Sequence, residues 1–249
     1  MRILSWNVNH RAGVRAIPEW LVPAIAADSP DMLVCTEYVR GPQHVEFLKA
    51  LREVGLRDSD VTAPYHPGAN CILVAAREPL LGGPVHPPAD SDSAVQSGFA
   101  HVIVEQSAIH LFALRRPEPS EMSGANVPDC EWLGDAVEPY LTEPSIVIAD
   151  FGAATGDAGD CDEEIGALMP RGWRLVSSRE GANPYVPSGS ERRLQLAFVS
   201  PLLSVSSAEY SWRFRDMSRE TSTQREGIPD QAMLVIDLER AEPVSPSRS

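Results

Sequence analysis

The sequence predicts a layered α/β or α+β fold, in which helices cover β-sheets. Short apolar runs alternate along the chain with segments of helical periodicity, which is the pattern of such folds. The composition is that of a globular protein, with 43% hydrophobic and 22% charged residues. At 249 residues, the chain can bury a substantial core in one domain. We expect that single domain to span residues 1–241, and the Pro/Ser-rich tail of residues 242–249 to be disordered.

The first part of the chain alternates strands with helices. Its predicted strands, all short apolar runs, are residues 3–8, 32–35 and 72–75. Its predicted helices are residues 15–27 and 43–54. Pro23 argues against a perfectly regular first helix, and the second helix places Val45, Leu48 and Leu51 on one face. Residues 79–98 are rich in Pro, Gly, Asp and Ser, which predicts a loop.

The remainder of the chain adds further strands and one more helix. Its predicted strands are residues 99–106, 109–114, 145–149, 173–177, 194–200, 209–215 and 232–238. Ser107 and Ala108 form a tight turn between the first two of these strands. Residues 129–141 have the pattern of a helix, with Asp129 as its N-cap.

The charge balance argues against one class of function. Lys and Arg total 21 against 35 Asp and Glu, a formal net charge of −14. Affinity for nucleic acid comes largely from phosphate neutralisation by Lys and Arg, so this chain is a poor candidate for non-specific nucleic-acid binding. A local basic groove or a bound divalent metal would still allow action on nucleic acid.

Cysteine spacing and hydropathy indicate the compartment. Cys35, Cys71, Cys130 and Cys161 are widely spaced and form no Cys-x-x-Cys motif. The chain begins directly with a predicted strand rather than a secretory segment, and no stretch approaches the ~18 apolar residues of a membrane span. We therefore expect a cytoplasmic protein with reduced thiols and no membrane partner.

Polar residues cluster at the ends of several predicted strands. They are Asn7, Asn9, Glu37, Asp150 and Asp230. Strand ends can converge on one rim of a sandwich, where carboxylate and amide oxygens would suit Mg²⁺ or Mn²⁺. Each residue also has a structural explanation, because Asp and Asn often cap turns and Glu is usually solvated.

Five segments of the chain read as motifs in a fixed order. They are MRILSWNVN at residues 1–9, DMLVCTE at 31–37, IADFG at 148–152, RLQLAFVS at 193–200 and PDQAMLV at 229–235. This series resembles the endonuclease/exonuclease/phosphatase superfamily, the fold of deoxyribonuclease I and exonuclease III. The resemblance implies a four-layered α/β sandwich, with two packed mixed β-sheets flanked by helices.

The resemblance also implies a metal site with Mg²⁺ or Mn²⁺ as the cofactor. The matching positions are Asn7, Glu37, Asp150 and Asp230, with Asn9 as a possible helper. In the resembled family the motif aspartate orients or deprotonates the attacking water, and the metal neutralises charge that develops on the phosphoryl group.

The catalytic half of the resembled site is altered in this sequence. Gly152 replaces the motif asparagine, and Gln231 stands where the family has a closing histidine. Gln195 occupies the position of that histidine's aspartate partner, and Arg115 falls at a middle-strand histidine. A Gln–Gln couple exchanges amide hydrogen bonds but cannot titrate, so ordinary phosphodiester hydrolysis should be weak, absent or rerouted to other chemistry.

Arginine side chains are candidates for binding an anionic substrate. Arg115 and Arg116 would offer planar guanidinium groups to a phosphate or carboxylate. The alternation in residues 212–215 (WRFR) would place Arg213 and Arg215 on one strand face, although a solvated outer face is the simpler explanation. Among the histidines, we expect His110 to pack away from Arg115, and we assign no role in the site to His10 or His66.

Two functional hypotheses from different classes remain. The first is a divergent metal-dependent phosphoesterase or derived enzyme, with Asp150 as the remaining base and an anionic small molecule rather than bulk nucleic acid as its substrate. The second is a catalytically inactive binding or scaffolding module, for which a protein partner would be expected. The preserved Asn7, Glu37, Asp150 and Asp230 favour the enzyme, because buried carboxylates without a partner are costly.

Overall fold

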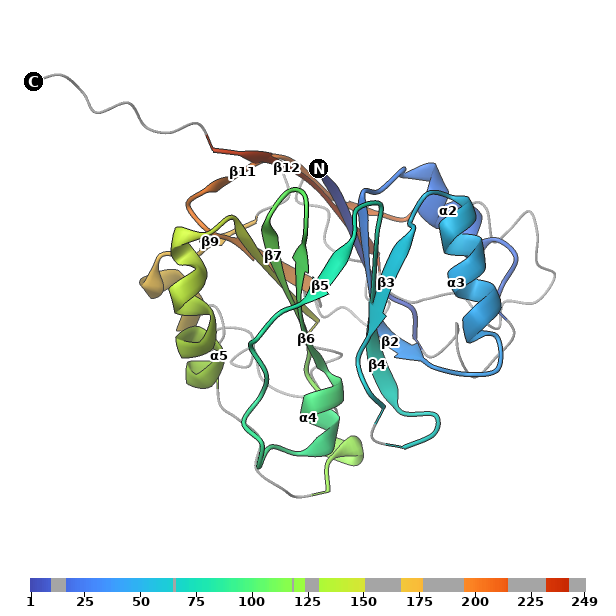
Figure 1. Ribbon diagram of the computed structural model, residues 1–249, viewed down its shortest axis with the longest axis horizontal. Helices are drawn as coiled ribbons and strands as arrows, with labels where there is room; N and C mark the ends of the chain where they lie inside the picture. Colours follow the sequence, from blue (N-terminus) through green and yellow to red (C-terminus); the bar gives the residue numbers. More distant parts are fainter. Residues whose placement is uncertain are drawn as a thin grey trace, which may run out of the picture.

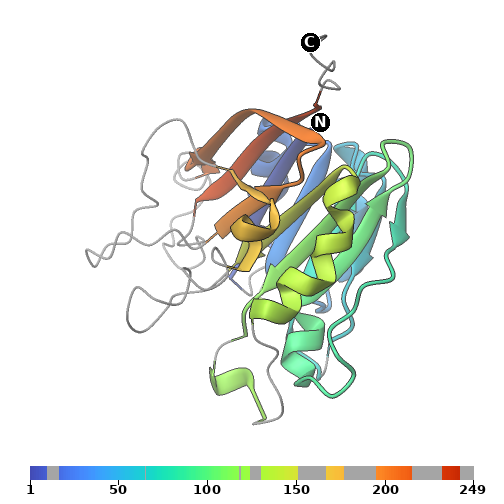
Figure 2. The same ribbon diagram turned by 90° about the vertical axis from the view of Figure 1, so that its left-hand side faces the viewer.

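The computed structural model describes most of the chain. The described residues are 1–9, 17–64, 66–117, 119–123, 130–150, 167–176, 195–214 and 232–241. They form two six-stranded sheets with helices on the outer faces, as Figures 1 and 2 show. Within these residues, no helix is long and apolar enough to cross a membrane.

Both sheets are mixed, and each has a parallel strand pair at its centre. Sheet A has the order β11 (Leu203–Ser211), β12 (Met233–Arg240), β1 (Arg2–Asn7), β2 (Met32–Val39), β4 (Asn70–Ala76) and β3 (Asp58–Val61). Sheet B has the order β5 (Leu80–Gly82), β6 (Phe99–Val104), β7 (Ile109–Arg115), β8 (Ser145–Asp150), β10 (Gln195–Val199) and β9 (Arg174–Leu175). The parallel pairs are β1 with β2 and β7 with β8, whereas the neighbouring pairs are antiparallel.

Three apolar layers hold the sheets and helices together. Between the sheets, alternate residues of both pack face to face, among them Ile3, Val34, Leu111 and Ile148, all almost fully buried. Helices α2 (Leu21–Ala27) and α3 (His44–Glu53) cover the outer face of sheet A. Helix α5 (Cys130–Val137) and the 3-10 turn η2 (Glu138–Thr142) lie against sheet B, as do Leu168 and Trp173 on either side of the 3-10 turn η3 (Met169–Arg171). The predicted four-layered sandwich is therefore confirmed.

Residues 79–98 and the segment before Asn70 contain elements that the sequence did not reveal. The predicted loop holds the short edge strand β5 and the helix α4 (Ser93–Ser97), whose N-cap Asp92 accepts a hydrogen bond from Ala94 N (2.9 Å). Strand β3 was missed because its sequence, DSDV, is mostly polar. Polar and short strands are typical of sheet edges, where they discourage pairing with other chains.

The predicted helices differ from the observed ones in their extent and facing. The first helix begins only at Leu21, because Pro18 and Trp20 precede it in a turn, and Pro23 is tolerated in its first turn where no intrahelical N–H partner is needed. In α3 the prediction for Val45 is wrong. Val45 is 69% exposed, whereas Phe47 and Leu51, one helical turn apart, face the core.

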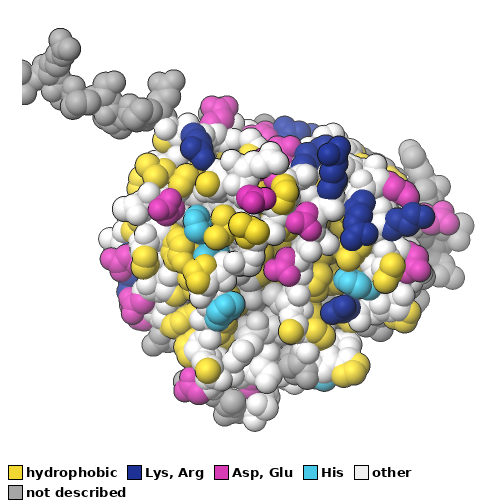
Figure 3. Space-filling view, viewed as in Figure 1, with side chains coloured by type: hydrophobic (Ala, Val, Ile, Leu, Met, Phe, Trp, Pro, Cys, Tyr) yellow, Lys and Arg dark blue, Asp and Glu magenta, His cyan; other side chains and the backbone are white. Residues whose placement is uncertain are grey.

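Charge is unevenly distributed over the surface. Figure 3 shows Lys and Arg side chains gathered on the side of α3, although the sequence carries a net charge of −14. Lys49 and Arg52 of α3, and Arg57 after it, are exposed. Cys35 and Cys71, the cysteines whose side chains the structure describes, are free and buried.

The outer face of sheet B carries a pair of histidines, of which His101 is buried and His110 is half-buried. The His101 ring stacks on Phe112 with centroids 4.1 Å apart, and its Nδ1 accepts a hydrogen bond from Val85 N (3.2 Å). His101 Nε2 must therefore carry the proton, and it donates to His110 Nδ1 (3.1 Å). Gly83 passes so close that a Cβ there would lie 2.3 Å from the His101 ring. As predicted, His110 faces away from Arg115.

This histidine pair predicts a loss of stability in acid. Burial, reinforced by the neighbouring His110 and His86, lowers the pKa of His101 to about 4, whereas the unfolded value is near 6.5. Between these values the unfolded chain binds more protons, so the free energy of unfolding falls as pH falls, by up to about 1.4 kcal/mol per pH unit.

Urea denaturation of wild type and His101→Phe between about pH 7.5 and about pH 4.5 tests this expectation. The variant keeps the stacking on Phe112 but has no titratable ring at this position. The free energy of unfolding of wild type, minus that of the variant, should therefore fall as pH falls. A difference in the free energy of unfolding that stays constant over this range would contradict the lowered pKa of His101.

Candidate active site at the carboxyl ends of the parallel strands

The carboxyl ends of the two parallel strand pairs meet at one rim of the sandwich. In sheet A, Asn7 at the end of β1 is paired in register with Thr36 of β2. In sheet B, Arg115 at the end of β7 is paired with Asp150 at the end of β8. Four polar side chains from four strands therefore reach the same region, although they are far apart in the sequence.

Asp150 bridges the two sheets. Its side chain is 1% exposed, and its Oδ2 accepts hydrogen bonds from Asn7 Nδ2 (2.8 Å) and from Thr36 Oγ1. Asn7 Oδ1 in turn accepts from Asn9 N (2.8 Å), in a turn where Asn9 has a φ of 49°. The structure thus brings Asn7, Asn9 and Asp150 together. Asn9 takes part through its main chain.

Glu37 is positioned by a β-bulge rather than by the end of a strand. Strand β2 continues to Val39, past the predicted end at residue 35. Cys35 pairs with Leu73 and Tyr38 with Cys71, so two residues of β2 oppose one residue of β4. Glu37 lies in this bulge with a φ of 51°. The bulge redirects its carboxylate toward the rim and accounts for the error in the predicted strand end.

Arg115 is buried among carboxylates. Its side chain is 4% exposed, with Nη2 2.7 Å from Glu121 Oε2 and 3.7 Å from Glu37 Oε1. The other oxygen of Glu121 accepts a hydrogen bond from Asn70 Nδ2 (2.7 Å). Neither Asn70 nor Glu121 was predicted as a site residue, because Asn70 lies at the amino end of a strand and Glu121 in a 3-10 turn, η1 (Pro119–Glu121).

These residues line a cavity of about 470 Å³. Its walls are Glu37, His66, Gly68, Ala69, Asn70, Arg115 and residues 120–123. His66, to which no role in the site was assigned from the sequence, lines this cavity with an exposed side chain. Asp150 and Asn7 are not part of the described lining. They lie behind it, next to Thr36, the neighbour of Glu37.

Gln195 connects the sheets a second way. It is 2% exposed and is paired in register with Asp150. With its amide oriented to satisfy its neighbours, Nε2 donates to Ser5 O (3.1 Å) and Oε1 accepts from Asn7 N (2.8 Å). Gln195 therefore fixes the backbone that carries Asn7. Gln231 and Asp230 lie outside the described residues.

Arg116 and Arg213, the described arginines that were predicted to join Arg115, lie in different settings. Arg116 has an exposed side chain, although its main-chain N–H donates to Asp150 O (2.9 Å). The prediction that residues 209–215 form one strand is wrong, because β11 ends at Ser211. Arg215 lies outside the described residues.

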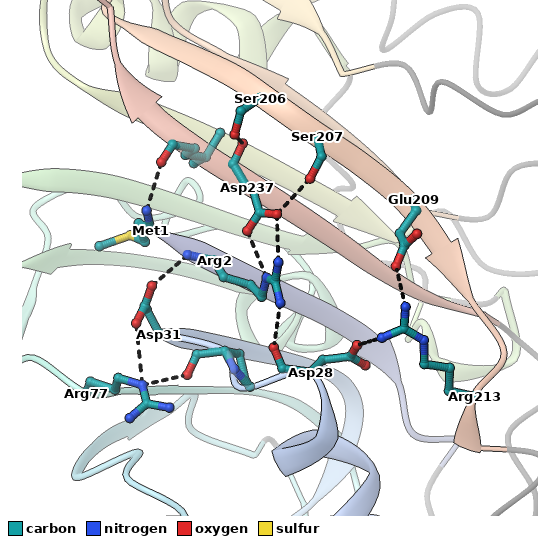
Figure 4. A network of polar contacts seen from close by, with 12 residues as sticks. Met1, Arg2, Asp28, Asp31, Arg77, Ser206, Ser207, Glu209, Arg213 and Asp237 are labelled. Atoms are coloured by element: carbon teal, nitrogen blue, oxygen red, sulfur yellow. Dashed lines mark hydrogen bonds and ion pairs between the residues drawn. The ribbon is translucent and has the colours of Figure 1, made fainter.

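Arg213 belongs to a separate polar network, shown in Figure 4. Its guanidinium contacts Asp28 Oδ1 (2.8 Å) and Glu209 Oε1 (3.3 Å). The main-chain oxygen of Asp28 accepts from Arg2, which begins β1 and also pairs with Asp237. Burial raises the pKa of Asp28, whereas the Arg2 hydrogen bond lowers that of Asp237 to about 2. This network surrounds the first residue of β1, roughly 17 Å along the strand from its last.

Comparison with solved structures identifies the architecture. No protein-family model and no curated protein sequence matches the chain. An endonuclease/exonuclease/phosphatase from Beutenbergia cavernae superposes with a TM-score of 0.64 at 18% identity, covering 98% of this chain and 73% of that one. An AP endonuclease from Archaeoglobus fulgidus gives 0.62 at 13% identity, covering 96% and 99%. The protein has the endonuclease/exonuclease/phosphatase fold. A humanised TDP2 from D. rerio is also similar, with a TM-score of 0.57 at 14% identity over 96% and 98% of the two chains.

These matches confirm the fold that the sequence motifs predicted. At identities of 18% or less they concern the fold, and the chemistry must be argued from the residues of this chain.

The metal implied by the endonuclease/exonuclease/phosphatase fold can be tested against the donors at the rim. Glu37, Asp150 and Asn7 offer carboxylate and amide oxygens, which are the ligands that Mg²⁺ and Mn²⁺ prefer. Within the described part of the chain, no group of three or more His, Cys, Asp or Glu residues is close enough to hold a metal. Glu37 accepts no hydrogen bond from any described residue, so its carboxylate has capacity for a cation. The donors fit such an ion in type.

Proposed function

We propose that the protein is a divergent metal-dependent phosphoesterase-like enzyme. It would bind Mg²⁺ or Mn²⁺ together with an anionic, phosphorylated small molecule, while ordinary phosphodiester hydrolysis is weak or rerouted to other chemistry. The observation that carries this proposal is the convergence of two sheets at one rim, where Asp150 bonds to Thr36 and the next residue, Glu37, faces the buried guanidinium of Arg115.

The charge balance of the rim supports a cation. Two carboxyl groups, those of Glu37 and Glu121, lie next to one guanidinium, that of Arg115, and Asp150 is paired in register with Arg115 on the neighbouring strand. An anionic substrate would be repelled by this excess of negative charge. A divalent cation held at Glu37 would offset the excess, and it would supply neutralisation of the charge that develops on a phosphoryl group.

The residues of this chain would then divide the work. Asp150 would accept a proton from a water or substrate hydroxyl. Among the described carboxyl groups, it is the one that ends a strand of one parallel pair and is hydrogen-bonded to both strands of the other. Asn7 and Thr36 donate to Asp150 Oδ2 and fix the orientation of its carboxyl group. Arg115 and His66 would face the substrate from the cavity wall. Gln195 would hold the Asn7 backbone in place.

A binding module without turnover is the second candidate. Gln195 favours this candidate, because the nitrogen and the oxygen of its side-chain amide both bond to the main chain of β1. The residue therefore has a structural role. Such a protein would bind a ligand or a protein partner at the same rim.

Calorimetric titration with Mn²⁺ and Mg²⁺ tests the proposal and separates these candidates. We expect wild type to bind the metal and Glu37→Gln to bind it about 10-fold or more weakly, because one carboxylate charge is lost next to the ion. Glu105→Gln is the matched control, since Glu105 is exposed at the opposite end of β6. An unchanged affinity in Glu37→Gln would contradict the assigned site.

Hydrolysis of an activated phosphodiester by the same proteins then distinguishes the candidates. Metal-dependent turnover supports the enzyme. Metal binding without turnover, on this substrate and on phosphorylated small molecules, supports the binding module.

A further inference from the structure

The contact between Arg115 and Glu121 has the form of a bound ligand. Glu121 Oε2 lies 2.7 Å from Arg115 Nη2, and Glu121 Oε1 accepts from Asn70 Nδ2 at 2.7 Å. A single carboxylate thus spans two donors from different sheets, Asn70 of β4 and Arg115 of β7. Both donor side chains are almost completely buried, at 2% and 4% exposure, so their positions are fixed before any ligand arrives.

The donors keep unused hydrogen-bonding capacity. Arg115 Nε and Asn70 Oδ1 are buried and have no hydrogen-bond partner among the described residues. The Asn70 amide cannot simply be turned around, because its Nδ2 already donates to a carboxylate. Glu121 therefore occupies only the Nη2 corner of the guanidinium edge formed by Nε and Nη2, an edge that binds an oxyanion side-on through two parallel hydrogen bonds.

Glu121 is carried by a short segment that is tethered at a second point. Ser123, two residues later, donates to Asp92 Oδ2 from both N and Oγ, at 2.8 Å each. Asp92 is also the N-cap of α4. Residues 120–123 form one wall of the cavity that Arg115 and Asn70 also line, so movement of Glu121 would uncover the donor atoms that its carboxylate now occupies.

We propose that Asn70 and Arg115 form a two-donor clamp for a phosphoryl group, and that Glu121 is its internal occupant, displaced when the ligand binds. The inference deepens the proposed function, on which it rests for the nature of the ligand. It adds Asn70 as a substrate-binding residue and Glu121 as the residue that sets the affinity for anions. A phosphoryl group would use the free Nε of Arg115, and a hydroxyl on the ligand would satisfy Asn70 Oδ1.

Binding of inorganic phosphate in the presence of EDTA tests the clamp without metal or turnover. We expect Glu121→Gln to raise the affinity for phosphate by about 10-fold or more over wild type, because a like charge is removed from the site. Glu105→Gln removes the same charge from a remote turn and should change the affinity by less than about twofold. Glu121→Ala should show the same gain in phosphate affinity, and it leaves no side-chain amide that could take the place of the carboxylate at Asn70 Nδ2. Adding Asn70→Ala to Glu121→Gln should abolish it.

Other outcomes would overturn the clamp. These are an unchanged affinity in both Glu121 variants, an equal gain in the Glu105 control, or a gain that persists without Asn70. A parallel titration with acetate distinguishes the ligand class, since equal gains for acetate and phosphate would overturn the preference for a phosphoryl group. The proposed function fails separately, through loss of metal binding or of its dependence on Glu37, so the two failures are distinguishable.

Discussion

Replacing Arg115 with leucine is expected to lower the free energy of unfolding by about 3–5 kcal/mol, the usual cost of removing one partner from a buried ion pair. Arg115 is 4% exposed and is the described cation nearest to both Glu37 and Glu121. Without it, two partly buried carboxylates face each other with no compensating charge. Urea denaturation at neutral pH measures the effect.

A second substitution and a control make this prediction specific. Adding Glu121→Gln to Arg115→Leu should recover about 1–2 kcal/mol, since it removes one of the uncompensated charges. Arg77→Leu breaks the exposed pair with Asp31 (3.4 Å) and should cost no more than about 1 kcal/mol. A cost for Arg115→Leu as small as that of Arg77→Leu would show that the cluster is well solvated.

The central strands were readable from the sequence because burial on both faces gives them continuous apolar runs. Strands β4 and β8 are buried along their whole length, and the predicted segments fall within them. The edge strands β3 and β5 were missed for the converse reason, as their residues are polar or few. Trp212, Arg213 and Phe214 follow a strand rather than extend it. Alternation of residue types over so few positions does not distinguish these two cases.

The candidate site was readable only in part, because its contacts join segments distant in sequence. Asn7, Glu37 and Asp150 were predicted as site residues from their motifs, and the structure places them at one rim. Asn70 and Glu121 carry no local signal, since their importance comes from the guanidinium that reaches them from another strand. The direction of the Glu37 side chain depends on a bulge whose pairing partner lies in β4, which a linear motif does not specify.

Replacing Asp150 with asparagine is expected to lower metal-dependent turnover of an activated phosphodiester by about 10²–10⁴-fold, the usual contribution of a general base. The amide oxygen of asparagine can still accept from Asn7 Nδ2 and Thr36 Oγ1, so the two sheets remain joined. The amide cannot accept the proton, and the rate should be lost with little change in the melting temperature. Measuring kcat/KM in Mn²⁺ together with thermal unfolding separates these effects.

Two comparisons decide whether Asp150 acts as the base or only as a link between the sheets. Asp60→Asn is the matched control, because Asp60 is exposed on the edge strand β3 and its replacement should leave kcat/KM unchanged. Thr36→Val removes one hydrogen bond to Asp150 Oδ2. Because that bond favours the ionised carboxylate, its loss should move the acidic limb of the pH–rate profile to higher pH. If Asp150→Asn retained wild-type turnover, or lost turnover only in proportion to unfolding, Asp150 would be a structural bridge and the base would have to lie elsewhere.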